Sequence, residues 1–282
     1  MNICDFDIYY NKLSSITSNS FEKKLLKASI DLLKQENNPL KINNFSSSVR
    51  ELLRHILNSL APDEEVTKCD WFQWQENERG KKIVTRKSRI KYAIQKNFPS
   101  KYITKNFNEL DDFINDIYDI YERLNKYTHI EEKYFNMPIE EEQNAIKYIL
   151  NVLCAFCDKI KEVKTSLDNE IYEHVRTKLS SSFFMESIDK IDCLSTHTTP
   201  DDLEVCDIKF IDESFENILV RVTGNAYVHL QYGSDHDCDR DNGFETDDSF
   251  PFESDVKIII DDDFPNNAEI LSFDVNTDSF YE

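Results

Sequence analysis

The spacing of apolar residues changes from a helical to a strand period along this 282-residue chain. Up to about residue 180, apolar side chains recur every three or four positions, as on one face of an α-helix. From about residue 204 they alternate at every second position, as in Ile218, Val220 and Val222. We therefore expect an α+β protein in which helices come first and a sheet follows.

Charged residues divide the chain in a similar way. Residues 1–180 contain 28 acidic and 28 basic side chains, whereas residues 181–282 contain 26 acidic and 5 basic ones. The formal net charge of −21 therefore lies in the last third, which suggests modules with different partners. We predict a helical bundle at residues 1–165, a connecting helix at 166–182 and a smaller acidic β-rich domain at 183–282.

Four long amphipathic segments predict a four-helix bundle in the first module. They cover about 20–36, a stretch between Ser48 and Pro62, about 108–126, and the residues after Pro138. Ser48 and Glu51 have the spacing of a capping box at a helix start. In the second module, residues 223–225 (Thr-Gly-Asn) predict a hairpin turn between two short strands.

A polar insertion at about 61–105 interrupts the bundle and carries a strongly basic stretch. Residues 79–105 contain ten Lys and Arg side chains and no Asp or Glu. Tryptophans lie just upstream, and cations beside aromatic rings suit phosphates and unstacked bases. The candidate nucleic-acid-binding residues are Arg86, Lys87, Arg89, Lys91, Trp71 and Trp74. The alternative is a solvated helix face with aromatic side chains that anchor a loop.

The end of the third long helix carries a candidate catalytic group. Arg123 lies on its last turns and His129 falls in the loop that follows. A His can transfer protons at neutral pH, and an Arg can bind the phosphate that reacts in RNA cleavage, so this chemistry needs no metal. Asn125 and Thr128 can add hydrogen bonds. The alternative is an ordinary helix end, in which Arg123 pairs with a nearby carboxylate.

A second Arg–His pair lies within one helix. Arg50 and His55 are five positions apart, so at about 100° per residue their side chains point about 140° apart. We therefore interpret this pair as structural and expect Arg50 and Arg54 to line the bundle surface.

The pattern of an Arg, four to six residues and a His at a helix joint resembles HEPN ribonucleases. The wider sequence also resembles the predicted PIWI-associating nucleases of prokaryotic conflict systems. The stretches that carry this resemblance are 48–55, 60–62, 90–95, 126–129, 230–235 and 249–252.

This resemblance implies a metal-independent RNA endonuclease, without a cofactor, that acts in prokaryotic anti-phage or inter-genomic conflict defence. It also implies RNA as the substrate, a possible homodimer, and a PIWI or helicase component as a partner. The alternative function is a non-catalytic adaptor of a defence complex that binds its partner through the acidic domain. That domain can instead cover the basic region of the same chain and hold the nuclease inactive.

Two further patterns bear on metals and on location. Asp235, Asp237, Asp239 and Asp241 resemble a calcium loop, but the glycine falls one position late at Gly243, so we predict no metal site. A metal-dependent nuclease built on this cluster remains a further alternative. The seven cysteines fit reduced thiols, and Cys154 and Cys157 lie in an apolar helical run where we expect them to pack in the core. Without a signal-like start or a membrane span, we expect a cytoplasmic protein.

Overall fold

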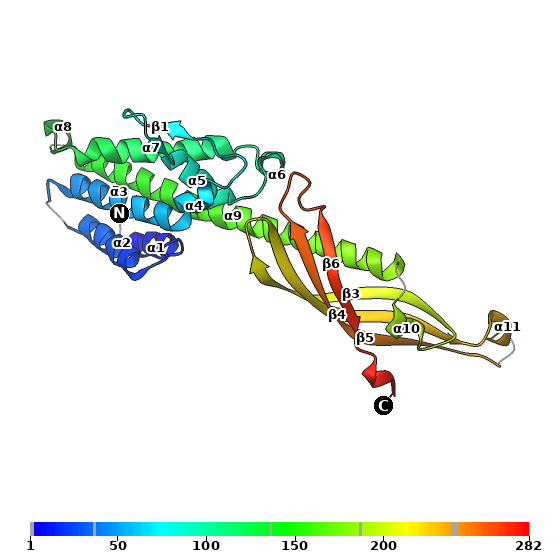
Figure 1. Ribbon diagram of the computed structural model, residues 1–282. Helices are drawn as coiled ribbons and strands as arrows, with labels where there is room; N and C mark the ends of the chain where they lie inside the picture. Colours follow the sequence, from blue (N-terminus) through cyan, green and yellow to red (C-terminus); the bar gives the residue numbers. More distant parts are fainter. Residues whose placement is uncertain (1–2, 36–37, 136, 186–187, 239–241, 282) are drawn as a thin grey trace. The chain divides into compact units, whose positions relative to one another are not determined.

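The computed structural model describes residues 3–35, 38–135, 137–185, 188–238 and 242–281 (Figure 1). The chain forms two compact units, Met1–Thr165 and Ser166–Glu282, which we call the helical unit and the sheet unit. The first consists mainly of helices and the second contains a four-stranded antiparallel sheet. The predicted α+β class is therefore confirmed, whereas a HEPN-like arrangement of the helices stays a prediction.

The core of the helical unit comes from the apolar stripes of its long helices. These are α1 (Ile3–Ser14), α2 (Ser20–Leu33), α3 (Lys41–Leu60), α7 (Leu110–Thr128) and the first part of α9 (Ile139–Met185). Helix α3 packs against both α2 and α7. The stripes bury side chains at helical spacing, including Leu53 and Ile56 of α3, Ile117 and Leu124 of α7, and Leu150 and Phe156 of α9.

Helix α3 begins earlier than the capping pattern predicts. It starts at Lys41, so Ser48 lies inside the helix and the predicted capping box is wrong. The additional turns are favoured by burial, because Ile42 and Phe45 are 1% and 0% exposed. Glu51 is therefore free of a capping role and pairs instead with the two arginines beside it, Arg50 and Arg54.

The basic insertion folds into short elements on the helical unit. These are α4 (Asp63–Val66), β1 (Gln75–Glu76), β2 (Lys82–Ile83), α5 (Arg86–Gln95) and α6 (Ser100–Asn106). Strands β1 and β2 form a small antiparallel hairpin. The side chain of Thr85 caps α5 by accepting a hydrogen bond from the amide of Ser88 at 3.1 Å. Helix α5 packs against α3 and α7, which places the basic stretch beside both.

The expected fourth bundle helix and the expected connecting helix are one helix. After the short α8 (Glu132–Phe135), α9 runs for 47 residues without a Gly or Pro to interrupt it. Pro138 precedes its first residue, and Glu140, Glu141 and Glu142 occupy its first turn, where the helix dipole favours carboxylates. Cys154 and Cys157 are buried in its apolar stripe, and burial raises the pKa of these thiols to about 11 and about 12.

The sheet unit contains the strands β3 (His197–Glu213), β4 (Asn217–Tyr232), β5 (Phe244–Ile259) and β6 (Ala268–Val275). They pair in sequence order, each antiparallel to the next. Alternate side chains of β4 are buried, as are those that face them on β5 from Phe250 to Ile258. Phe183 of α9 contacts Phe273 of β6. The short elements α10 (Asp189–Asp192), α11 (Asp235–Cys238) and η1 (Asp278–Tyr281) complete the unit.

The predicted turn at residues 223–225 is wrong, because β4 runs straight through it. Gly224 lies inside this strand, opposite Val205 of β3 and Phe252 of β5. A Cβ atom there would lie 1.9 Å from the carbonyl oxygen of Glu204. Glycine is needed at this position because β3 bulges nearby and its backbone approaches closely, not because the chain turns.

Two expectations concern metals and membranes. Among the residues that the structure describes, no group of three or more His, Cys, Asp or Glu side chains is placed to hold a metal ion. Asp239 and Asp241 of the calcium-like pattern lie outside the described residues. A helix both long and apolar enough to cross a membrane is likewise not found in the described part of the chain.

Candidate functional site

Arg123 and Asn125 lie on different sides of α7. Two positions along a helix correspond to a rotation of about 200°, so their side chains face different neighbours. The guanidinium of Arg123 lies over the ring of Tyr148 of α9, 4.9 Å from the ring centroid. Asn125 faces α3, where its Oδ1 accepts a hydrogen bond from Nη1 of Arg50 at 3.5 Å. The structure therefore does not bring these two predicted site residues together.

Thr128 and His129 form the C-terminal end of α7. The hydroxyl of Thr128 donates to the carbonyl of Asn125 at 2.6 Å, which closes the last turn. His129 follows in an extended conformation and is exposed. Its backbone is fixed by Asn43 of α3, whose amide donates to the carbonyls of Tyr127 and His129 at 2.7 and 3.4 Å. Within the described residues, the imidazole of His129 has no hydrogen-bond partner.

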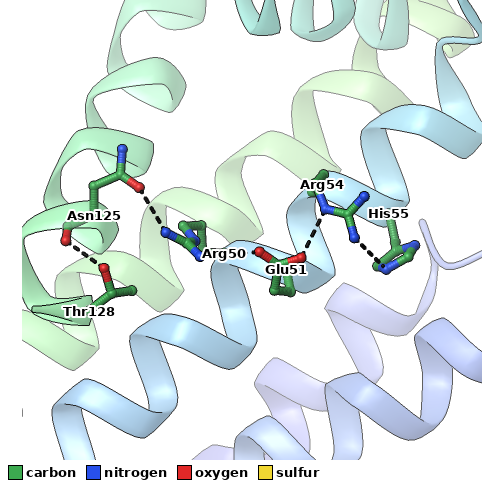
Figure 2. A network of polar contacts seen from close by, with 6 residues as sticks. All are labelled: Arg50, Glu51, Arg54, His55, Asn125 and Thr128. Carbon is green, nitrogen blue, oxygen red and sulfur yellow. Dashed lines mark hydrogen bonds and ion pairs between the residues drawn. The ribbon is translucent and has the colours of Figure 1, made fainter.

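A connected row of polar side chains runs along α3 (Figure 2). Glu51 lies between two arginines, 3.2 Å from Nη2 of Arg50 and 2.9 Å from Nε of Arg54. Arg50 reaches across to Asn125 of α7, so the row joins the two helices. The two guanidinium groups are 34% and 53% exposed as side chains, which leaves them accessible to an anion.

His55 ends this row. Nη2 of Arg54 lies 3.1 Å from its Nε2 (Figure 2), and because a guanidinium can only donate, Nε2 is the acceptor. This hydrogen bond requires the tautomer that carries its proton on Nδ1. The ring also packs edge-on against Phe21 of α2, with centroids 5.0 Å apart. As the helical rotation predicts, Arg50 and His55 contact different partners. The contact between His55 and its sequence neighbour Arg54 has no signal in the sequence pattern.

The surface beside α5 and the β1–β2 hairpin is hollowed in two adjoining places. The larger hollow, which we call the Lys87 hollow, has a volume of about 1110 Å³ and is lined by Arg86, Lys87, Arg79 and Tyr118, among others. The smaller hollow, of about 340 Å³, is lined by Trp71 and Lys91. We call it the Trp71 hollow. Lys87 borders both.

Cations in this region lie over aromatic rings. Arg86 lies 4.9 Å from the ring centroid of Tyr121, Lys87 lies 4.8 Å from that of Tyr118, and Lys91 lies 5.0 Å from that of Trp71. Such contacts hold the cations in place while leaving their donors available to an anion. Burial raises the pKa of the Tyr121 phenol, and the positive charge of Arg86 partly opposes that effect.

Two of the predicted nucleic-acid-binding residues have other surroundings. Arg89 donates to the carbonyl of Ala61 at 2.6 Å and pairs with Asp63, so it holds α5 against the end of α3. Trp74 is 51% exposed and packs edge-on against Phe72, with centroids 5.1 Å apart. An exposed indole just before a short hairpin is suited to stack against an unpaired base.

Comparison with protein families gives two matches that together span most of the chain. A family described as "Predicted pPIWI-associating nuclease" matches residues 13–153, and a second family with the same description matches residues 160–281. The first match covers half of the chain and contains every candidate site residue. Searches of curated proteins and of solved structures gave no match.

Proposed function

The chain belongs to the predicted pPIWI-associating nucleases, and from this premise we propose that it is an RNA endonuclease of prokaryotic defence. The observation that supports a nucleic-acid substrate most strongly is the pair of adjoining hollows in the helical unit. Their rims combine Lys and Arg side chains with accessible aromatic rings, which is the combination that binds unpaired nucleic acid.

The proposed reaction uses the 2′-hydroxyl of RNA as its nucleophile. A neutral histidine accepts the proton of this hydroxyl, and the 2′-oxygen attacks the adjacent phosphorus. The bond from phosphorus to the 5′-oxygen breaks, and that oxygen takes up a proton. The products are a 2′,3′-cyclic phosphate and a 5′-hydroxyl. An arginine stabilises the charge that develops on the phosphate oxygens.

We propose Arg123 and His129 as the groups for this reaction. Thr128 closes the helix turn before His129, whereas Asn125 faces α3 and is left out of this group. The exposed imidazole of His129 has its ring nitrogens available for proton transfer, and Asn43 fixes its backbone. Arg123 can leave the ring of Tyr148 for a substrate phosphate, since a cation–π contact at an exposed site contributes only about 0.5–1 kcal/mol.

Arg54 and His55 form a second candidate pair for the same reaction. They are in direct contact, and Arg50 lies on the same helix face, about 40° from Arg54. In this pair a substrate phosphate must first draw Arg54 away from Nε2 of His55, because that nitrogen already accepts a hydrogen bond.

Single-residue variants separate the two pairs. We expect purified protein to cleave single-stranded RNA in EDTA, and one of His129→Gln and His55→Gln to lower the rate at least about 100-fold. Loss with His129→Gln and Arg123→Gln supports the first pair, whereas loss with His55→Gln and Arg54→Gln supports the second. Wild-type rates in all four variants would contradict Arg–His catalysis at either place.

The family name implies association with a pPIWI protein, and we propose the sheet unit as the part that makes it. The face of the sheet away from its apolar side is rich in carboxylates. Asp255 holds Arg221 through two hydrogen bonds of 2.8 and 2.9 Å, and Asp247 lies 2.7 Å from His229. A basic protein surface complements this face, which also supports the alternative of an adaptor without catalysis.

Co-purification tests the partner, and sedimentation tests the proposed homodimer. A charge-reversed sheet face, Asp247→Lys with Glu253→Lys, should lose the pPIWI protein while the rate of RNA cleavage stays unchanged. Retained binding would contradict this placement of the partner. A monomer at all concentrations that support cleavage would contradict the proposed homodimer.

A further inference from the structure

Polar and aromatic residues form one stripe along α7 that points toward the basic elements. Asn115, Tyr118, Tyr121 and Asn125 fall within about 120° around the helix axis. Arg123 lies about 160° from both Tyr121 and Asn125 and is therefore off the stripe. The stripe is about 15 Å long at a rise of about 1.5 Å per residue.

Each member of this stripe is contacted by a cation from α5 or α3. Lys87 donates to Asn115 at 2.8 Å and lies over Tyr118. Arg86 lies over the ring of Tyr121. The charges of Glu51 and Arg54 also affect the pKa of the Tyr121 phenol. Arg50 reaches Asn125. The basic insertion and the polar row of α3 are therefore two ends of one arrangement along α7.

We propose that a single strand of RNA lies over the cations that cover this stripe, with successive phosphates bound by Lys87, Arg86, Arg54 and Arg50. This inference rests on the proposed RNA substrate and extends it. We call the four cations the α7 track. A strand whose bases stay stacked as in a duplex rises by about 3.4 Å per nucleotide, so about four nucleotides cover about 15 Å. The hollows beside Lys87 lie at one end, and the Arg54–His55 contact lies toward the other.

In the absence of RNA, the carboxylate of Glu51 neutralises part of the positive charge of the α7 track. It pairs with both Arg50 and Arg54, so a phosphate must compete with it for these two guanidinium groups. Removal of its charge should therefore strengthen RNA binding. A strengthened interaction is informative because a variant that merely damages the fold weakens binding.

The test measures how the full chain binds a fluorescent, single-stranded 2′-O-methyl RNA of twelve nucleotides, which cannot be cleaved through the 2′-oxygen. For four phosphate contacts the plot of log affinity against log salt should have a slope of about −2.8. Each of Lys87→Gln, Arg86→Gln, Arg54→Gln and Arg50→Gln should reduce the magnitude of this slope by about 0.7. Glu51→Gln should raise the affinity about twofold to fivefold.

Matched controls remove an exposed cation elsewhere. Lys147→Gln of the helical unit and Arg176→Gln of the sheet unit should keep the wild-type affinity and slope. Duplex RNA of the same sequence should compete poorly, since the track binds one strand.

The α7 track is overturned if Arg50→Gln and Arg54→Gln keep the wild-type slope, if Glu51→Gln weakens binding, or if duplex RNA competes as well as the single strand. Cleavage of unmodified RNA is measured separately. If the binding results overturn the α7 track but unmodified RNA is still cleaved, the nuclease proposal stands. If unmodified RNA is not cleaved, the nuclease proposal itself is contradicted.

Discussion

A methyl group added at Gly224 tests how closely β3 approaches β4. An ideal Cβ on this residue lies 1.9 Å from the carbonyl oxygen of Glu204 and 2.7 Å from Cε1 of Phe252. The carbonyl belongs to a paired strand, and Phe252 is buried and stacked with Phe273, so rotation of one side chain cannot relieve both contacts. We expect Gly224→Ala to lower the free energy of unfolding of the sheet unit by about 3 kcal/mol, at the upper end for overpacking.

Urea denaturation followed by circular dichroism measures this loss in the full chain, and hydrogen exchange of β4 amides assigns it to the sheet unit. Gly80→Ala is the matched control. Gly80 has a φ of +69° but no atom within 4 Å of an added Cβ, so strain alone should cost about 1 kcal/mol. A loss at Gly224 no larger than the loss at Gly80 would refute the packing argument.

Three further outcomes follow from the hydrogen bonds of single residues. Glu22, buried in α2, accepts from Ser59 and from the amide of Ser18, so Glu22→Gln should lower the free energy of unfolding by about 2 kcal/mol in urea denaturation. Burial raises the pKa of the Glu22 carboxyl, but the hydrogen bonds have the larger combined effect, so this pKa lies below its ordinary value in the folded protein. The stabilisation by Glu22 should therefore be present above about pH 4.3 and lost as the pH falls through the folded pKa. Asn43→Ala should cost about 1 kcal/mol and slow RNA cleavage if His129 is the proton acceptor; an unchanged rate in a folded variant would argue against His129. A hydrogen bond to Asp247 raises the pKa of His229, so its contribution should be present below about pH 6.5 and lost as the pH rises through the folded value; an NMR titration in which Asp247→Asn leaves this pKa unchanged would contradict the contact.

Periodicity in the sequence predicted the helices more accurately than their ends. It located α2 and α7 to within a few residues, because each buries one continuous apolar stripe. It placed the start of α3 too late, because the capping pattern at Ser48 was visible whereas the burial of Ile42 and Phe45 depends on tertiary packing. At Gly224, glycine between two alternating runs has the same appearance in a hairpin turn and in a crowded strand.

The candidate site was likewise only partly predictable from the sequence. Arg123 and His129 were found because they are near each other in sequence, and their cooperation remains a prediction. The contact between Arg50 and Asn125 joins residues 75 positions apart, which only the packing of α3 against α7 brings together. The hollows beside Lys87 likewise depend on how the β1–β2 hairpin lies beside α7, which composition cannot specify.

Cleavage of single-stranded RNA in EDTA is the most direct test of an Arg–His ribonuclease. The wild-type chain and the double variant His55→Gln with His129→Gln are compared, and the ends of the products are identified. We predict 2′,3′-cyclic phosphate and 5′-hydroxyl ends from the wild type, and a rate at least about 100-fold lower from the double variant. Equal rates for the two proteins, or cleavage that requires a divalent metal and proceeds equally on DNA, would contradict the proposed function.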